Sequence, residues 1–493
     1  MPSPWGFQRA GLLLRVFALP GVSFAQEEYF ISGPKCDNFA SHYTLSSSEI
    51  IRAGISNTTA NNVNIALNFE RSNWATNSVT VDPFYTWPLS NGSQPQILPG
   101  SLLSVEEITD TSLYTVPPSV SLSRILYQTS TLNGTAITAS AYVLWPYLPR
   151  GFANPNVTGL PVVGWAHGTS GVMSECAPSH IRNLWYQYKA TYVLALQGYV
   201  VVAPDYAGLG VGASPSDDDD EGVRHPWLSA YAHANDLLYA VQAAQSAFPS
   251  LSRSFVLMGH SQGGGAAWAA ATQQSASPTP GYLGTVVAAP APGGPDLLEL
   301  AVSGQQNLVG AYLGYGVRSQ YPEVPAEDIF TEAGAARLRL LRELGGCSSM
   351  ATVLFATPGI NYTQTGWTDG WAAQAYANQS DYGGKQIAGP MLVLQGGMDP
   401  LAPEETTSAA LNRTCEMYPQ SQIRYASFGG VSHVPVLYAG QHIWLDWIEK
   451  RFEGVPVDPG CTQAAYESIR DVNSYSEAAN YYLQLVTEAY EDP

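Results

Sequence analysis

The feature that most constrains the fold is an apolar run that passes through a glycine-rich turn into an alanine-rich segment. Residues 255–258 are Phe-Val-Leu-Met, residues 259–263 are Gly-His-Ser-Gln-Gly, and residues 264–271 are Gly-Gly-Ala-Ala-Trp-Ala-Ala-Ala. Such an apolar run is typical of a strand that is covered on both faces. The two glycines that flank the turn leave room for strand and helix to approach each other, and the alanines let the helix lie close to the sheet. The segment therefore predicts a strand, a tight turn and a helix.

The rest of the chain repeats this alternation of strands and helices. The turn signal Asn133-Gly134 joins two alternating segments, residues 124–131 and 135–145, and predicts a hairpin. Further strands are expected at residues 161–166, 199–203, 254–258, 284–289, 390–395 and 422–428, with helices at 233–248, 264–274, 403–411 and 438–452. Strands that alternate with helices indicate an α/β fold with a mainly parallel central sheet.

The strand ending near residue 289 and the one starting at residue 390 are separated by far more chain than the roughly two to six residues of an ordinary connection. We interpret residues 291–385 as a helical lid, with helices at 296–302, 327–344 and 368–377. The core then comprises residues 116–290 and 386–455. Residues 26–115 are expected to form an N-terminal extension with one helix at 63–74, and residues 456–493 a tail whose helix packs back onto the body.

The composition excludes one broad class of partner. The formal net charge is -19, only 12% of the residues are charged, and no cluster of Lys and Arg is present. An acidic surface repels phosphate backbones, so a nucleic-acid partner is not expected. The acidic run at residues 217–221 is expected to be a solvated loop. With 45% hydrophobic residues, the chain can bury a large core.

Several features predict a secreted, extracellular protein. Residues 11–24 are mostly apolar, and the small-x-small pattern Ser23-Phe24-Ala25 follows at their end, which is typical of a signal peptide covering residues 1–25. No other run is long and apolar enough to span a membrane. Five cysteines predict two disulfides and one leftover thiol, with the pairing left open. Seven glycosylation sequons are present, at Asn57, Asn91, Asn133, Asn156, Asn361, Asn378 and Asn412. No metal site is expected, because no Cys or His pair has ligand spacing.

The serine in the glycine-rich turn is the candidate nucleophile. A strand, a Gly-x-Ser-x-Gly turn and a helix together form the context of a nucleophile elbow, which exposes the Ser261 hydroxyl. A serine becomes nucleophilic when a histidine takes its proton and a carboxylate orients that histidine. On this fold the expected chain order is serine, acid, histidine.

Candidates for the acid and the base follow the last two strands. Asp399 comes just after the strand at 390–395, whereas its competitors Asp369 and Asp381 lie within the insertion. His433 follows the strand at 422–428 through a Gly-Gly turn, whereas His442 falls inside the last helix and is expected to pack or face solvent. The sequence thus predicts Asp399 and His433 as partners of Ser261.

Backbone N–H groups are expected to hold the negative oxygen that develops during attack. The residue after the nucleophile, Gln262, is one candidate donor. Thr169, in the loop that follows the strand at 161–166, is the other. His167 precedes it in a His-Gly turn, and we expect that histidine to be structural.

A set of motifs carries a family resemblance. The chain resembles the secretory lipase family, which includes Candida lipase A-type enzymes and related bacterial esterases. The likeness covers about residues 115–461 and lies in Trp-Ala-His-Gly-Thr at 165–169, Cys-Ala-Pro-Ser at 176–179, Pro-Asp-Tyr at 204–206, Gly-His-Ser-Gln-Gly-Gly at 259–264 and Asp-Trp-Ile at 446–448.

The resemblance implies an α/β-hydrolase fold, the triad Ser261, Asp399 and His433, a lid over the acyl pocket, and hydrolysis of lipid-like esters without a cofactor. It also implies the disulfides Cys176–Cys347 and Cys415–Cys461, which leaves Cys36 as the odd thiol. We therefore expect a carboxylic ester hydrolase of the triacylglycerol lipase or carboxylesterase type, monomeric and in no more than transient contact with lipid interfaces. The same triad could serve an acyltransferase or a peptidase, and a non-catalytic binding protein is the third hypothesis.

Overall fold

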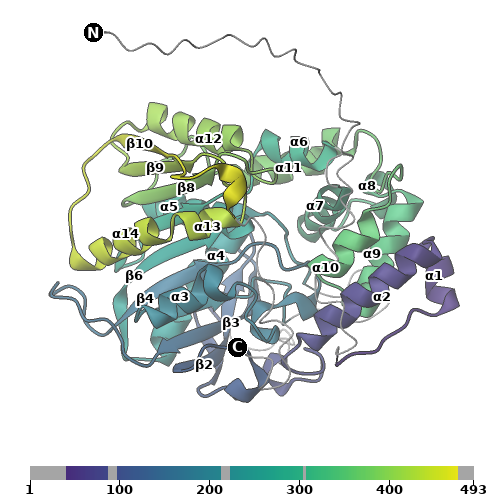
Figure 1. Ribbon diagram of the computed structural model, residues 1–493, viewed down its shortest axis with the longest axis horizontal. Coiled ribbons are helices and arrows are strands. Elements are labelled where there is room, and N and C mark those ends of the chain that lie inside the picture. Colours follow the sequence, from purple (N-terminus) through teal and green to yellow (C-terminus); the bar gives the residue numbers. More distant parts are fainter. Residues whose placement is uncertain (1–39, 87–96, 212–222, 304–306, 476–493) are drawn as a thin grey trace, which may run out of the picture.

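A single mixed sheet forms the centre of the molecule (Figure 1). The computed structural model describes residues 40–86, 97–211, 223–303 and 307–475. Within those residues the sheet has ten strands in the order β1-β2-β3-β5-β4-β6-β7-β8-β9-β10. They are β1 (Leu102–Glu106), β2 (Val120–Ser130), β3 (Ala136–Pro146), β4 (Leu160–Ala166), β5 (Val200–Pro204), β6 (Leu251–His260), β7 (Tyr282–Ala288), β8 (Met391–Gly396), β9 (Ile423–Phe428) and β10 (Cys461–Tyr466).

The sheet is antiparallel at one side and parallel over the rest. Strands β1, β2, β3 and β5 pair antiparallel, whereas β5, β4 and all later neighbours pair parallel. The predicted hairpin is β2 and β3, and its Gly134 has φ +83°, which favours glycine. The carboxyl ends of β4, β6, β8 and β9 therefore lie at one edge of the sheet, where the loops of an α/β fold build binding sites.

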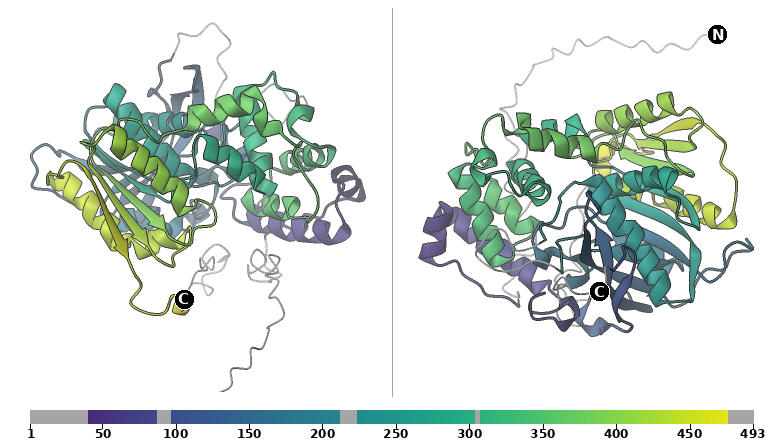
Figure 2. Two further views of the ribbon diagram at one scale, coloured as in Figure 1. Left: turned by 90° about the horizontal axis from the view of Figure 1, so that it is seen from above. Right: turned by 180° about the vertical axis from the view of Figure 1, so that it is seen from behind.

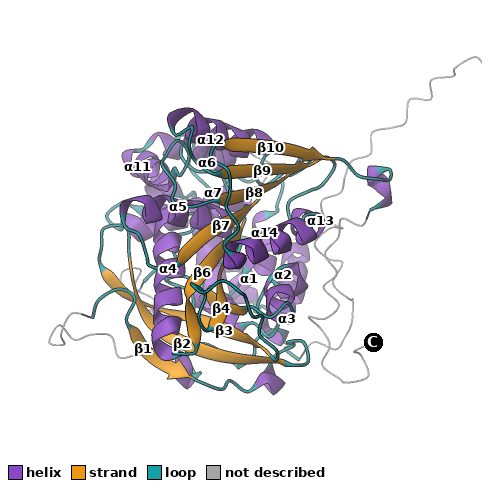
Figure 3. Cartoon of the chain, turned by 90° about the vertical axis from the view of Figure 1, so that its left-hand side faces the viewer, coloured by secondary structure: helices purple, strands orange, loops and turns teal. Residues whose placement is uncertain are grey.

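Helices cover both faces of the sheet (Figure 3). One face carries α4 (Ala230–Ala247), α5 (Gln262–Ala276) and α12 (Glu404–Met417), and its core is rich in alanine, with Trp268 and Phe255 fully buried. The other face carries α3 (Thr191–Leu196), α13 (Pro435–Ala439) and α14 (Gln441–Glu453), which bury Trp444 and Phe452. Strands buried on both faces explain the continuous apolar runs of the sequence.

Two edge strands were not predicted. Strand β1 lies within the expected extension, and β10 lies within the expected C-terminal tail, where it pairs parallel with β9. Both strands are partly exposed along most of their length, so neither shows an apolar run or a clean alternation. Their pairing is decided by the free edge of the neighbouring strand and not by a local pattern.

The insertion between β7 and β8 consists of helices that lie beside the sheet, and we call it the cap (Figure 2). The single helix expected at 327–344 is two helices, because Phe330 leaves the helix to bridge Thr363. Helices α7 and α10 were not predicted. The helices of the cap are α6 (Pro295–Val302), α7 (Asn307–Gln320), α8 (Ala326–Ile329), α9 (Glu332–Leu344), α10 (Ser348–Phe355) and α11 (Trp371–Ser380).

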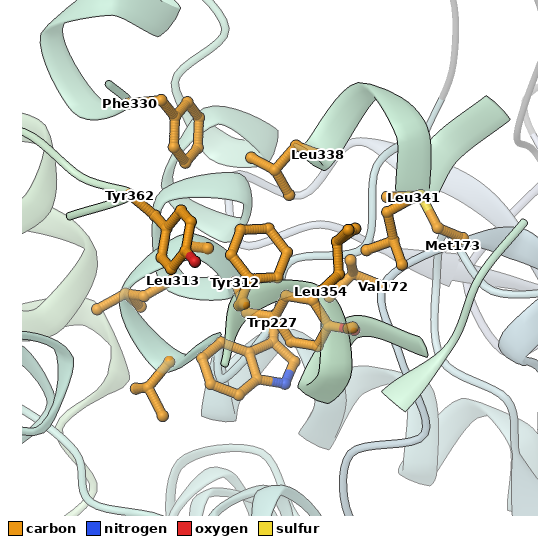
Figure 4. Packing of buried hydrophobic residues seen from close by; sticks show 14 of the residues in the cluster. Val172, Met173, Trp227, Tyr312, Leu313, Phe330, Leu338, Leu341, Leu354 and Tyr362 are labelled. Atoms are coloured by element: carbon orange, nitrogen blue, oxygen red, sulfur yellow. The ribbon is translucent and has the colours of Figure 1, made fainter. Parts of the chain in front are cut away.

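The first two helices, α1 (Ser47–Ala53) and α2 (Asn57–Ser72), pack on this cap and not on the sheet. Helix α1 contacts α9, and α2 contacts α10. They share with the cap one apolar cluster that also includes Val172 and Met173 from the loop after β4, and Figure 4 shows its aromatic centre around Tyr312 and Trp227. The N-terminal helices thus complete the core of the cap.

Two disulfides are present, with the pairing that the family resemblance implied. Cys176–Cys347 links the loop after β4 to the start of α10, and Cys415–Cys461 links α12 to β10. The predicted signal peptide, Cys36, Asn91, the acidic run at 217–221 and the predicted C-terminal helix beyond residue 475 lie outside the described residues.

Candidate active site

Ser261 lies on a strained turn between β6 and α5. Its φ is +58° and its ψ is -121°, a combination that a non-glycine residue rarely adopts. The two flanking glycines are required by close approach: a Cβ on Gly259 would lie 2.0 Å from the Gly263 carbonyl oxygen, and one on Gly263 would lie 2.0 Å from the Ala166 oxygen. Strand β6 and helix α5 therefore meet tightly and raise Ser261 above the sheet edge, where its side chain is partly accessible.

Asp399 and His433 form a buried pair. His433 Nδ1 lies 2.7 Å from Asp399 Oδ2, and the Asp399 side chain is fully buried. The other carboxylate oxygen, Oδ1, accepts from the backbone N–H groups of Leu401 and Ala402 at 2.9 and 2.8 Å. These bonds fix the plane of the carboxylate, so His433 is held with Nε2 directed away from Asp399.

The structure also ties the Ser261 turn to the His433 loop. The buried ring of His260 lies 4.6 Å from the ring of His433, centroid to centroid, and His260 Nε2 lies 3.0 Å from the His433 carbonyl oxygen. Because a carbonyl can only accept, His260 Nε2 is the donor. Among the described residues, the Ser261 hydroxyl itself makes no hydrogen bond to His433 in this structure.

The neighbouring Tyr186 extends this chain of hydrogen bonds to the loop after β4. Its hydroxyl lies 2.5 Å from His260 Nδ1 and accepts from the Gly168 N–H at 3.1 Å. Since Nε2 of His260 carries the proton, Nδ1 accepts from Tyr186. Burial holds the pKa of His260 well below its usual value, which keeps the ring neutral and able to accept.

The peptide bond between Gly168 and Thr169 is held from its carbonyl side. The Gly168 oxygen lies 3.2 Å from Trp185 Nε1 and 2.7 Å from His167 Nδ1. In a planar trans peptide, the N–H of Thr169 points opposite to this carbonyl. Within the described residues, the N–H groups of Thr169 and Gln262 donate to no protein acceptor. Two backbone donors are therefore left for a ligand beside Ser261.

The side chain of Gln262 is fixed by a buried polar network. Its Oε1 accepts from Thr169 Oγ1 at 3.0 Å, and its Nε2 lies 2.9 Å from His225 Nε2 and 3.1 Å from His233 Nε2. Burial lowers the pKa of His233 to about 3 and that of His225 well below its usual value, so both rings are neutral and can accept. Trp227 Nε1 donates to Thr169 Oγ1 at 2.9 Å, which joins this network to the cap core of Figure 4.

The residues weighed as alternatives to Asp399 and His433 have other partners or other positions. Asp381 pairs with Arg413 at 2.9 Å, Asp369 belongs to a short turn of the cap, and His442 is exposed on α14. His167 is buried and stacks on Tyr206 at 4.2 Å, and burial lowers its pKa to about 4. The predicted structural role of His167 agrees with this burial. Its ring also holds the Gly168 carbonyl.

The supporting residues were missed by the sequence analysis. Trp185, Tyr186, Trp227, His225 and His233 reach the site from loops and helices that are distant in sequence, and no motif surrounds them. The sequence does hold one signal of this polar network. The chain has only eight histidines in 493 residues, and two of them lie in the glycine-rich turn and in the His-Gly turn. Both turns follow strands, so this placement favours a polar cluster at the sheet edge.

The sequence of residues 165–445 matches the alpha/beta hydrolase family. This match covers more than half of the chain and spans β4 to α14, including the Ser261 turn and the Asp399–His433 pair. The chain belongs to the alpha/beta hydrolase family.

Solved structures share its fold. A structure of Candida antarctica lipase A has a TM-score of 0.62 at 17% identity, covering 80% of this chain and 90% of that chain. The same lipase in its closed state has a TM-score of 0.60 at 18% identity, covering 77% and 87%. The rice cell wall degrading esterase LipA from Xanthomonas oryzae has a TM-score of 0.54 at 20% identity, covering 73% and 98%. At these identities the likeness concerns the fold.

No curated protein sequence matches the chain. In the described part of the chain, no helix has the length and apolar character needed to cross a membrane.

Proposed function

We propose that this chain is a secreted serine esterase or lipase that hydrolyses lipid-like carboxylic esters. Ser261 Oγ attacks the ester carbonyl, and His433 takes the hydroxyl proton and returns it to the leaving alcohol. Asp399 orients His433 and stabilises its charged form. The acyl group remains on Ser261 until water, activated by His433, releases the acid. No cofactor takes part.

The observation that carries this proposal is the Asp399–His433 pair at 2.7 Å beside a serine on a strained turn. Two backbone N–H groups fix the second oxygen of Asp399, so its carboxylate is held in place to orient the imidazole, which is the role that the reaction requires. Ser261 and His433 close to hydrogen-bonding distance when substrate binds, since such bonds are often long in free enzymes.

The N–H groups of Thr169 and Gln262 are the proposed oxyanion donors. The Gly168 carbonyl, on the other side of the Thr169 peptide, is bonded to Trp185 and His167, and the Gln262 side chain is bonded to Thr169, His225 and His233. Both donors are therefore preorganised for the charge that develops on the carbonyl oxygen. Loss of one such donor costs about 3 kcal/mol of transition-state stabilisation.

The lipid-like substrate class rests on the cap and on the family resemblance. The lipase A of Candida antarctica and the esterase LipA of Xanthomonas oryzae share the fold, and their names describe ester hydrolysis. A chain-length series of esters, monomeric and micellar, tests the class. Activity that rises above the micelle threshold would favour a lipase over a soluble esterase.

The central test is Ser261→Ala. We expect turnover of a chromogenic ester to fall by on the order of 10⁴-fold or more, and labelling by a fluorophosphonate to disappear. Ser246→Ala, an exposed serine on α4, is the matched control and keeps both properties. Substantial ester cleavage by Ser261→Ala would contradict the mechanism.

Acyl transfer and peptide cleavage are the alternative reactions on the same triad. Product analysis in the presence of an alcohol acceptor separates transfer from hydrolysis. A non-catalytic binding protein would fail to react with the fluorophosphonate.

Secretion is proposed together with glycosylation and a monomeric state. The six described sequon asparagines, at positions 57, 133, 156, 361, 378 and 412, are all exposed, as glycan attachment requires. A shift in mass after treatment with an endoglycosidase tests the modification on protein secreted from a eukaryotic host.

A further inference from the structure

The two residues that supply the proposed oxyanion donors are bonded to each other through their side chains. Thr169 lies in the loop after β4, and Gln262 is the first residue of α5, directly after Ser261. Thr169 Oγ1 donates to Gln262 Oε1 at 3.0 Å, although the two residues are 93 positions apart in the chain. The spacing of their backbone N–H groups is therefore constrained by a side-chain hydrogen bond as well as by the sheet.

The proton positions around this bond have one consistent arrangement. The Ala207 carbonyl can only accept, so His225 Nδ1, 3.0 Å away, carries a proton. Burial lowers the pKa of His225 and keeps its ring neutral, so Nε2 is an acceptor for Gln262 Nε2 at 2.9 Å. The amide nitrogen of Gln262 thus faces the histidine, and its amide oxygen faces the Thr169 hydroxyl, which donates.

A second buried histidine holds the same amide nitrogen. His233 Nε2 lies 3.1 Å from Gln262 Nε2, and its ring stacks on that of His225 with 4.9 Å between the centroids. Because an amide nitrogen carries two protons, it can donate to both rings at once. His233 Nδ1 in turn lies 3.6 Å from Asp236 Oδ2, which accepts from the Ala207 N–H at 3.1 Å. Both rings are therefore fixed on the side away from Gln262.

At its other end this network reaches the cap core. Trp227 Nε1, which can only donate, bonds to Thr169 Oγ1 at 2.9 Å. The indole packs edge-on against Tyr312 of α7, with 5.4 Å between the ring centroids, and the Trp227 carbonyl accepts from the Tyr376 hydroxyl of α11 at 2.7 Å. Figure 4 shows Trp227 and Tyr312 within that core. The packing of the cap thus fixes the indole that holds Thr169.

We propose that these side chains form an oxyanion clamp, which sets the spacing of the two backbone donors before substrate arrives. The clamp consists of Trp227, Thr169, Gln262, His225 and His233. Trp227 and the two histidines act through Thr169 and Gln262, so they are positioning residues. The Thr169 hydroxyl donates within the clamp and is not a third donor to the substrate. The inference rests on the proposed function and states how the oxyanion site is held, because preorganised donors need no rearrangement when charge develops.

An alkyl trifluoromethyl ketone tests the clamp on the full chain. Ser261 Oγ bonds to its carbonyl carbon, the hydroxyl proton passes to His433, and the carbonyl oxygen takes the negative charge that the two N–H groups hold. Its inhibition constant therefore reports on the oxyanion site, whereas KM for an ester of the same chain length reports on substrate contacts. Trp227→Phe removes one bond of the clamp and keeps both backbone donors. We expect kcat to fall and ketone inhibition to weaken in parallel, each about tenfold, with KM unchanged.

Thr169 offers a second variant and a rescue. Thr169→Val, of similar volume, loses the hydroxyl and should match Trp227→Phe, and Thr169→Ser should recover most of that loss. Combining Trp227→Phe with Thr169→Val should add little, because both changes break the same chain of bonds. Thr169 is only partly buried, so its variants are expected to fold even if Trp227→Phe does not. Trp371→Phe, at an exposed tryptophan of α11, is the matched control and should alter neither kcat nor ketone inhibition.

Two results would overturn the clamp. One is native kcat and native ketone inhibition in both Trp227→Phe and Thr169→Val. The other is a rise in KM without weaker ketone inhibition, which would place these side chains at the substrate. Labelling by a fluorophosphonate separates this outcome from a failure of the proposed function. A native chain that neither cleaves the ester nor takes the label removes both proposals, whereas a labelled, active chain with unaltered variants removes the clamp alone.

Discussion

At the scale of single residues, the site depends on side chains that touch neither Ser261 nor a substrate. Tyr186 is the clearest case, because its hydroxyl is hydrogen-bonded to two loops of the candidate site. It accepts from Gly168, next to the proposed donor Thr169, and donates to His260, whose other nitrogen holds the His433 carbonyl. The backbone that positions Tyr186 is strained, because three neighbouring residues have positive φ values: Leu184, Trp185 and Gln187.

Tyr186→Phe removes this hydroxyl and leaves the Gly168 N–H and His260 Nδ1 without partners. We expect kcat for an ester to fall about tenfold with little change in KM. The reason is that the proposed oxyanion donor and base would be less well positioned, whereas the contacts that bind the substrate would remain. The control is Tyr188→Phe, an exposed tyrosine two residues away. A change confined to KM would refute a positioning role for Tyr186.

At the scale of elements, α2 holds the start of α10. Both oxygens of Glu70 accept at 2.8 Å, from the N–H groups of Cys347 and Met350. The first turn of a helix has such unpaired donors, so Glu70 caps α10 from another helix. The disulfide Cys176–Cys347 joins the same helix end to the loop that carries Thr169.

Glu70 also makes stability depend on pH. Burial raises the pKa of Glu70 to about 7 from its usual 4.5, even though its backbone hydrogen bonds lower it. The folded state therefore holds this proton more tightly than the unfolded state, and the stabilisation present below pH 4.5 is lost as pH rises through 7.

Glu70→Gln cannot titrate, so its stability relative to the native chain should improve on the order of 3 kcal/mol between pH 4.5 and pH 8. Denaturant unfolding at both pH values measures this difference. Glu332→Gln, in the first turn of α9, is the control. Parallel pH dependence of Glu70→Gln and the native chain would contradict the assignment.

At the scale of the whole molecule, the chain has separate apolar clusters. Two lie on opposite faces of the sheet, and one joins α1 and α2 to the cap. Figure 2 shows α1 and α2 lying beside the cap. This arrangement predicts that the cap and the N-terminal helices gain and lose structure together, because neither part can bury its apolar face alone.

Leu67→Ala tests this coupling. Leu67 is fully buried on α2 within the cap cluster, so its truncation should cost about 2–5 kcal/mol. Hydrogen exchange should accelerate in α9 and α10 but not in α4 or α14. Ile65→Ala on the exposed side of α2, with 48% of its surface accessible, should change neither. Faster exchange limited to α1 and α2 would show that the cap is independent.

Local sequence determined the central elements of this protein. The buried strands β4 to β9 were predicted within a few residues, because a strand covered on both faces must be apolar throughout. The Ser261 turn was predictable because its two flanking glycines cannot be replaced: a Cβ at either one would lie 2.0 Å from a backbone oxygen. Asp399 and His433 could be proposed from the sequence because each lies in the loop that follows a late strand and the two stand in the expected chain order.

Only the tertiary structure decided the rest. The pairing of β10 with β9, the packing of α1 and α2 on the cap, and the reach of Tyr186 to His260 depend on surfaces that meet from distant parts of the chain. Periodicity and turn residues encode contacts between neighbours in sequence, whereas these contacts are set by how completed elements fit together.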